Sequence, residues 1–204
     1  PAMINMVLES DLPAEKISSL ICVRSGTAPL SVKAQQTFEQ RFGIPILPTY
    51  GATEFSGAVC GWTLEAKKAF GDVKAGSVGR AYDGVGLRIA DPESGEILPI
   101  GETGILQVRS QQMANEHDWV STTDLASIDA DGFVWLSGRA DAAINRGGFK
   151  IIPNEVAAIL EAHAQVKEAT VVAMDDARLG QVPVAAVELC EGASGVSEAS
   201  LKTW

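Results

Sequence analysis

The stretch Pro48-Thr49-Tyr50-Gly51-Ala52-Thr53-Glu54 places an aromatic ring, a glycine, a hydroxyl and a carboxylate within positions 50 to 54. The apolar run Ile44-Pro45-Ile46-Leu47 before it predicts a short buried strand. Glycine lets the backbone turn or approach a ligand closely, because it has no Cβ. A tyrosine ring can stack on a base, a threonine hydroxyl can bond to a phosphate, and a glutamate can bind Mg²⁺. On spacing alone, a strand-to-loop turn with a helix cap explains the same residues.

A second stretch lies upstream, Arg24-Ser25-Gly26-Thr27-Ala28-Pro29-Leu30, and it follows another short apolar run. Together with residues 48–54 and the motifs downstream, it resembles the adenylate-forming superfamily of acyl-CoA synthetases, luciferases and the adenylation domains of peptide synthetases. The resemblance covers nearly the whole chain, and the motifs come in the family's order. In that family, an SGxAPL-like loop and a YGxTE loop hold the adenine and phosphates of ATP and then of the acyl-adenylate.

The resemblance implies roles for residues in both loops. Thr53 and Glu54 are the implied catalytic residues, and Glu54 is also the implied Mg²⁺ ligand. The nucleotide-binding residues that it implies in these loops are Gly26, Thr27, Ala28, Pro29, Tyr50, Gly51, Ala52 and Thr53.

The composition argues against some functions. The 204 residues are 46% hydrophobic, which is enough to bury a substantial core, and their number fits one large or two small domains. Lys and Arg number 16 against 26 Asp and Glu, a formal net charge of -10. Such a surface repels polyanions, so nucleic-acid binding is not expected. An acidic protein that binds ATP must build its positive potential locally.

The three cysteines, Cys22, Cys60 and Cys190, are far apart and form no CxxC pair, so neither a disulfide framework nor a zinc site is indicated. No apolar run is long enough for a transmembrane segment and no signal peptide is visible, so the expected location is the cytoplasm. The chain opens at Pro1 rather than at a methionine, and residues 197–204 look like the start of a capped helix. We therefore expect a fragment of a longer protein.

The pattern predicts an α/β fold in which residues 1–75 form an α/β layer. A buried strand is expected at 20–23, and a helix opened by Ser31 and ended by Gly43 follows the upstream loop. The apolar stripe of this helix consists of Ala34, Phe38 and Phe42. Strand, helix and strand with functional loops favour a layer in which ligands lie beyond the carboxyl ends of the strands.

From about Gly76 the pattern changes to short alternating runs separated by turn residues, which predicts a small antiparallel β unit over 76–140. The clearest turn is 91–96, after an alternating strand, and another strand is expected at 133–136. By resemblance, residues 1–140 are the end of the large adenylation domain, and this β unit is its β-barrel-like subdomain.

Two further motifs carry implied nucleotide contacts. Thr122-Thr123-Asp124 resembles the family's TGD motif, whose aspartate accepts hydrogen bonds from ribose hydroxyls, although Thr123 replaces the usual glycine. The segment from Met113 to Trp119 is also shorter than in relatives. Gly138-Arg139-Ala140-Asp141 resembles the family's GRxD junction. Arg139 is the implied ribose or phosphate contact, and Asp141 is the implied hinge between the domains.

Residues 141–204 are expected to form a small, truncated α+β C-terminal domain. Its loop carries Gly147 and Gly148, which by resemblance line the CoA pantetheine tunnel, and Lys150, which lies near phosphate in relatives. A tight turn and a solvated lysine explain these residues equally well. A helix over 154–163 with Pro153 in its first turn and strands at 169–174 and 182–187 complete the prediction.

The resemblance implies that the full-length protein is an ATP-dependent acyl-CoA ligase. It would join a small-molecule carboxylic acid to AMP, with release of pyrophosphate, and then pass the acyl group to the thiol of CoA. The alternatives are an adenylation domain that loads a carrier protein, and a non-catalytic binding module. Because the family's lysine-bearing phosphate loop and its C-terminal lysine are missing from this sequence, we expect the chain alone to be inactive.

Overall fold

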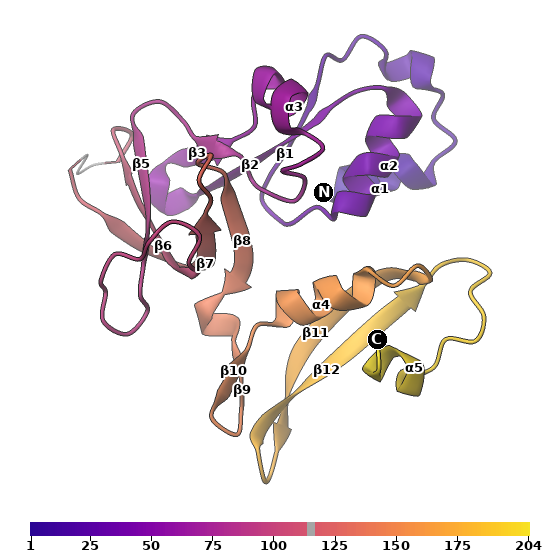
Figure 1. The fold of residues 1–204 in the computed structure, drawn as a ribbon. Coiled ribbons are helices and arrows are strands. Elements are labelled where there is room, and N and C mark those ends of the chain that lie inside the picture. Colours follow the sequence, from indigo (N-terminus) through magenta and orange to yellow (C-terminus); the bar gives the residue numbers. More distant parts are fainter. Residues whose placement is uncertain (114–116) are drawn as a thin grey trace. The chain divides into compact units, whose positions relative to one another are not determined.

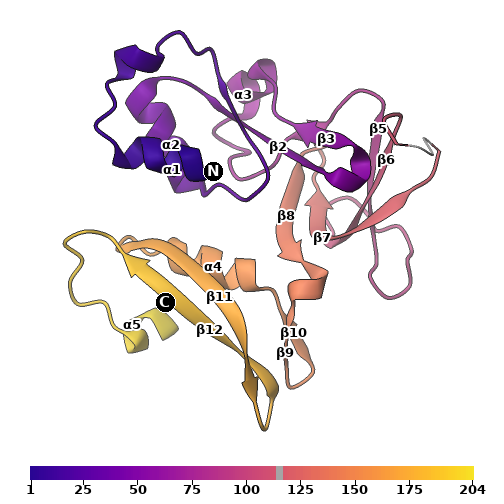
Figure 2. The same cartoon turned by 180° about the vertical axis from the view of Figure 1, so that it is seen from behind.

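The computed structural model describes residues 1–113 and 117–204, which fold as two compact units (Figures 1 and 2). The first unit comprises residues 1–122 and 126–136, and the second comprises residues 123–125 and 137–204. The predicted domain boundary at 140/141 falls just after this division and stays a prediction. The short segment predicted between Met113 and Trp119 lies partly outside the described residues. None of the described helices has the length and apolar character that a membrane crossing requires.

The first unit begins with a four-stranded sheet in the order β1-β2-β3-β4. Its strands are β1 (Val23–Ser25), β2 (Ile46–Ala52), β3 (Gly57–Gly61) and β4 (Arg80–Ala81). β1 and β2 pair in parallel because helix α2 (Val32–Phe42) connects them, whereas β2–β3 and β3–β4 are antiparallel. The carboxyl ends of β1 and β2 therefore share one edge, from which both predicted loops depart.

Helix α2 is confirmed together with its signals. The Ser31 hydroxyl accepts a hydrogen bond from the Ala34 amide, and Gly43 ends the helix with a φ of 68°. Its buried face carries Phe38 and Phe42, whose rings pack 4.8 Å apart. This face gives the layer its own hydrophobic core.

Helix α1 (Ala2–Glu9) packs beside α2, and the two run next to each other in both views (Figures 1 and 2). The Arg41 guanidinium on α2 donates hydrogen bonds to the carbonyls of Leu8 (2.8 Å), Ser10 (2.6 Å) and Leu12 (3.0 Å). It thereby satisfies the Leu8 carbonyl in the last turn of α1, which an isolated helix leaves unpaired, and ties the segment after the helix to α2. A short 3₁₀ turn, η1 (Ala14–Ile17), follows.

Helix α3 (Leu64–Phe70), capped by the Thr63 hydroxyl, was not predicted, because seven residues give too short a pattern to recognise. It follows β3 along the chain.

The second sheet has the order β5-β6-β7-β8. Its strands are β5 (Val85–Ala90), β6 (Gly104–Ser110), β7 (Val120–Ile128) and β8 (Val134–Arg139). β5 and β6 are antiparallel, and the predicted turn at 91–96 is confirmed by the Asp91 carboxylate, which accepts from the Glu93 and Ser94 amides. The sheet is open rather than a closed barrel, since it begins with β5 and ends with β8 within the described residues.

The second unit contains a sheet in the order β10-β9-β12-β11, next to the turn η3 (Ala140–Ala142). Its strands are β9 (Ile144–Arg146), β10 (Phe149–Ile151), β11 (Val166–Asp176) and β12 (Gly180–Leu189). Helix α4 (Pro153–Glu161) packs against β11, and the long β11–β12 hairpin is visible in both views (Figures 1 and 2). The chain ends with α5 (Glu198–Lys202), capped by Ser197 as expected. The α/β class is thus confirmed, with longer strands here than the sequence indicated.

Candidate functional site

The stretch 48–54 is mostly strand, so the predicted loop there is shorter than expected. β2 runs through Ala52 and pairs with β3, with a bulge between Tyr50 and Gly51. A Cβ on Gly51 would lie 2.2 Å from the Gly57 carbonyl oxygen. The glycine is therefore required by the close approach of the β3 backbone, whereas the sequence suggested a turn or a ligand.

The turn η2 (Thr53–Phe55) presents the two predicted catalytic side chains. Thr53 and Glu54 are exposed, whereas the Phe55 side chain is only 2% exposed and packs with Val59 and Cys60 in the core. Phe55 thus anchors the turn while its neighbours face solvent. Sequence reasoning missed Phe55, although an aromatic residue directly after polar positions could have suggested an anchor.

The upstream loop lies against the same strand. A Cβ on Gly26 would lie 3.0 Å from the Thr49 methyl carbon and 3.2 Å from the Thr49 carbonyl oxygen. Ser25, directly before this glycine, pairs with Pro48 across the parallel β1–β2 ladder. Thr27 has a φ of 70°, which is unusual for a β-branched residue and marks local backbone strain. The structure thus brings the two predicted nucleotide loops together at one edge.

A chain of side-chain hydrogen bonds crosses this edge. An Arg24 Nη1 donates to the Tyr82 hydroxyl at 3.0 Å, and the Tyr82 and Thr49 hydroxyls lie 3.1 Å apart. Thr49 Oγ1 donates to the Cys60 carbonyl at 2.9 Å. Gly61 makes room for the phenol, because a Cβ there would lie 2.0 Å from the Tyr82 hydroxyl. Tyr82 was missed because nothing in the sequence connects it with residues so far upstream.

The described residues contain no group of three or more His, Cys, Asp or Glu side chains that could hold a metal ion. A lone exposed carboxylate such as Glu54 nevertheless fits Mg²⁺, which is usually bound by one or two carboxylates together with substrate phosphates. Burial raises the pKa of the Cys60 thiol to about 12, so this cysteine is not a nucleophile at neutral pH.

Asp124, Arg139 and Asp141 belong to the second unit. Asp124 is half-buried in the middle of β7. Arg139 donates two parallel hydrogen bonds to Asp141, Nε to Oδ1 at 2.9 Å and Nη2 to Oδ2 at 2.7 Å. These bonds hold the pKa of the Asp141 carboxyl below its usual value. The predicted ribose or phosphate contact and the predicted hinge are therefore direct partners, which the sequence did not show.

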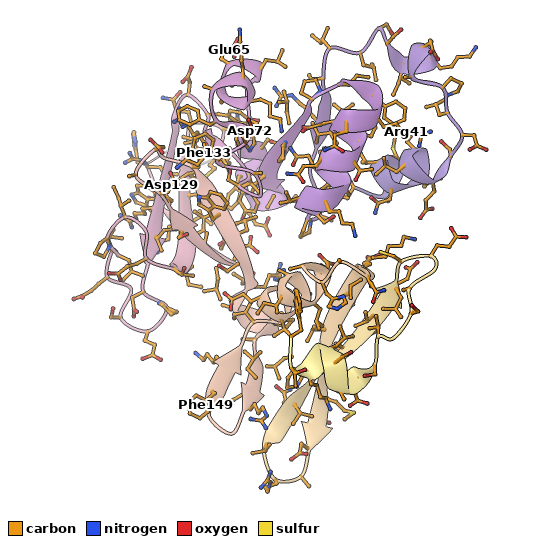
Figure 3. The ribbon with its side chains drawn as sticks, turned by 45° about the vertical axis from the view of Figure 1, so that its right-hand side comes forward. Arg41, Glu65, Asp72, Asp129, Phe133 and Phe149 are labelled. Atoms are coloured by element: carbon orange, nitrogen blue, oxygen red, sulfur yellow. The ribbon has the colours of Figure 1, made fainter. Side chains whose placement is uncertain are left out.

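Gly147 and Gly148 form the two-residue turn between β9 and β10. Their φ values of 59° and 91° lie in the left-handed region, as tight hairpin turns require. The Asn145 side chain accepts from the Gly148 amide at 3.2 Å. Phe149 beyond the turn is 77% exposed, and Lys150 is also exposed. Figure 3 labels Phe149 on this hairpin. The structure thus shows a tight turn at Gly147 and Gly148 and a solvent-exposed side chain at Lys150.

The geometry agrees with two matches to family models. Residues 1–116 match the model of AMP-binding enzymes, and residues 155–204 match the model of the AMP-binding enzyme C-terminal domain. The chain belongs to the AMP-binding enzyme family.

Relatives of this chain include proteins named as CoA ligases. The chain is 30% identical to 4-coumarate–CoA ligase 1 of Glycine max, over 99% of this chain and 74% of that protein. It is also 30% identical to 4-coumarate–CoA ligase 3 of Oryza sativa subsp. japonica, over 99% of this chain and 39% of the relative. ATP-bound MatB from Rhodopseudomonas palustris matches with a TM-score of 0.85 and 28% identity, over 98% of this chain and 42% of that one. The chain thus spans about two fifths of the length of the latter two proteins.

Proposed function

We propose that the full-length protein is an acid–thiol ligase, which activates a carboxylic acid as acyl-AMP and transfers the acyl group to CoA. The observation that carries the proposal is the pair of family matches, an AMP-binding model followed by its C-terminal domain model. CoA ligases among the relatives and an ATP-bound structural neighbour support CoA as acceptor and ATP as activating nucleotide. Location in the cytoplasm remains part of the proposal.

In the first half-reaction, the edge formed by β1 and β2 holds the nucleotide. Tyr50 offers a ring face to the adenine, and the Thr53 hydroxyl donates a hydrogen bond to a phosphate oxygen. Glu54 would hold Mg²⁺, which stabilises negative charge on the phosphates when bound. The core anchor Phe55 keeps Thr53 and Glu54 in place, so little reorganisation is needed when charge develops.

Residues of the second unit complete the proposal. Asp124 accepts hydrogen bonds from the ribose hydroxyls, and Arg139 contacts ribose or phosphate with its planar guanidinium group. Because Arg139 is paired with Asp141, nucleotide binding must compete with or add to that ion pair. The hairpin at Gly147 and Gly148 lies along the pantetheine arm of CoA in the second half-reaction, with Lys150 near phosphate.

The decisive experiment traps acyl-adenylates as hydroxamates with the full-length protein, ATP, Mg²⁺ and a panel of carboxylic acids. We expect hydroxamate with at least one class of acid, and acyl-CoA when CoA replaces hydroxylamine. Hydroxamate without acyl-CoA would indicate another acceptor, such as a carrier protein. No hydroxamate with any acid would contradict the proposed function. The 204-residue chain alone should stay at background in the same assay.

A residue-level test concerns Asp124. Asp124→Ala in the full-length protein should weaken ATP binding about tenfold to a hundredfold, since losing a hydrogen bond to a charged group typically costs about 1.5–3 kcal/mol. Titration calorimetry with ATP measures this directly. Arg88→Ala is the control, because Arg88 stacks on Trp119 and bonds to Gln107 in the β5–β6 sheet. Unchanged ATP affinity in the Asp124 variant would mean that another residue binds the ribose.

A further inference from the structure

Arg24 differs from several other arginines because the hydroxyl of a single tyrosine is its side-chain partner, which leaves most of its N–H donors unused. Arg41 caps α1, Arg80 lies between the Phe70 and Phe133 rings, and Arg139 pairs with Asp141. Among the described residues, Arg24 is exposed, bonds to the Tyr82 hydroxyl and has no carboxylate partner. On a chain with a formal net charge of -10, an exposed cation with unused donors is a local site of positive potential that can attract an anionic ligand.

The direction of the hydrogen bonds shows how Arg24 is held. A carbonyl oxygen only accepts, so the single Thr49 hydroxyl hydrogen points to the Cys60 carbonyl. The Tyr82 hydroxyl must then donate to Thr49 Oγ1, which leaves its oxygen free to accept from Arg24. Each bond polarises the next, and the chain ends on the β3 backbone.

Tyr82 is itself built into the fold. Its amide donates to the Val59 carbonyl at 3.0 Å, and its hydroxyl occupies the space that a side chain at Gly61 would fill. The phenol therefore cannot easily turn away from Arg24. One guanidinium nitrogen is committed to Tyr82, whereas a guanidinium has five N–H donors in a fixed fork. The remaining donors are available to a ligand.

The geometry points to Arg24 as an anion-recognition residue, positioned by Tyr82, that binds an anionic oxygen of one of the enzyme's own substrates. Arg24 lies on β1 directly before Ser25 and Gly26, where the loop proposed to hold ATP begins. The anionic oxygen belongs either to a nucleotide phosphate or to a second acidic group on the carboxylic acid. This inference rests on the proposed function.

The test measures pyrophosphate release by the full-length protein and its variants, with ATP and the acid varied separately. Acids are used in matched pairs with one or two carboxylates, such as hexanoic and adipic acid or benzoic and terephthalic acid. The variants are Arg24→Gln, Arg24→Lys and Tyr82→Phe. Arg178→Gln, which removes an exposed charge from the β11–β12 turn, is the matched control.

Arg24→Gln should raise one KM about tenfold to a hundredfold while the melting temperature stays at the wild-type value. A rise in the KM for ATP with every acid assigns the anion to a phosphate. A rise confined to the KM of acids with two carboxylates assigns it to the substrate. Arg24→Lys should raise the same KM by a smaller factor, because a positive charge remains. Tyr82→Phe should also raise that KM, because the guanidinium remains but its position is less fixed.

Kinetics of Arg24→Gln equal to those of Arg178→Gln would overturn the inference. An equal loss of kcat/KM for ATP and for every acid, together with a lower melting temperature, would also overturn the inference, because Arg24 would then only stabilise the fold. If Arg24→Gln does not fold, the Arg24→Lys and Tyr82→Phe variants decide by the same criteria. A wild-type protein without pyrophosphate release on any acid would instead refute the proposed function, and this inference with it.

Discussion

The turn at Thr53–Phe55 is fixed by a side chain in the core, whereas the hairpin at Gly147 and Gly148 is fixed by backbone geometry and by hydrogen bonds with Asn145 and the Leu179 carbonyl. Phe55 is 2% exposed, while Phe149, the aromatic residue next to the glycine pair, is 77% exposed. Figure 3 shows Phe149 at the end of its hairpin and Phe133 within the packed first unit. The core therefore preorganises the first region, while the second keeps its shape through left-handed glycines and the Asn145 side chain.

This difference matters for the proposed chemistry. A nucleotide site gains affinity and rate when its donors are already in place, because no ordering is required on binding. A surface hairpin with few buried neighbours can change its surroundings without disturbing a core. The predictions below contrast the two regions, from the largest expected effect to the smallest.

Phe55→Ala should lower the free energy of unfolding of the chain by about 3–5 kcal/mol, because it removes a buried aromatic side chain and leaves a cavity. Phe149→Ala should change it by less than about 0.5 kcal/mol, since that ring is already in water. Urea denaturation followed by tryptophan fluorescence measures both variants. Similar losses in the two would contradict the contrast between a core anchor and a solvent-facing ring.

Gly51→Ala should lower the free energy of unfolding by about 1–3 kcal/mol, because the new methyl group meets the β3 backbone. That backbone cannot move without breaking its hydrogen bonds to β2. Gly148→Asn should cost less than about 1 kcal/mol, because nothing lies within 4 Å of a Cβ there and asparagine tolerates left-handed backbone. The same denaturation assay compares them. An unchanged free energy of unfolding in Gly51→Ala would show that the β2–β3 bulge can rearrange to make room for the methyl group.

Asp129 lies in the turn between β7 and β8 (Figure 3), and its carboxyl should make the stability of the first unit depend on pH. Burial raises its pKa, but hydrogen bonds from Lys74, Trp135 and the Phe133 amide outweigh burial and lower the pKa to about 2. The folded-state pKa lies below the ordinary value of 3.8, so the stabilisation is present above about pH 4 and lost as the pH falls toward 2.

Asp129→Asn should therefore cost about 2 kcal/mol at pH 7 and flatten the loss of stability between pH 4 and pH 2. The pKa of Asp141 is also lowered, by its bonds to Arg139, but this ion pair is exposed and screened by water. Asp141→Asn should leave the loss of unfolding free energy between pH 4 and pH 2 unchanged. Unfolding measured from pH 2 to pH 7 tests both variants, and indistinguishable profiles would refute the assignment to Asp129.

Asp141→Pro in the full-length protein should affect the two half-reactions unequally, because proline fixes φ near -65° at the proposed hinge. Adenylate formation should survive better than thioester formation from preformed acyl-adenylate. Asp141→Ala is the control, since it also removes the partner of Arg139 but leaves the backbone free. Equal losses in both steps, together with a lower melting temperature, would show that Asp141 only stabilises the turn η3.

Local patterns predicted those parts of the fold whose causes are local. Helix α2 was predicted from Ser31, its aromatic stripe and Gly43, and the structure shows the cap, the buried face and the left-handed end. The turn at 91–96 and the strands β11 and β12 were predicted for the same reason, whereas β9 and β10, of three residues each, were not. The roles of the site residues stay predictions, although their motifs and order led to the family that the comparisons show.

The sequence by itself determined the family and the α/β class, because short motifs and periodic patterns carry that information within a few neighbouring positions. The tertiary structure alone decided that β2 continues through Gly51, that β3 requires this glycine and that Phe55 anchors the turn. It also joined Arg24 to Tyr82, which lie 58 positions apart in the chain. These features depend on backbone pairing and close packing between distant segments, which a local pattern of residue types does not encode.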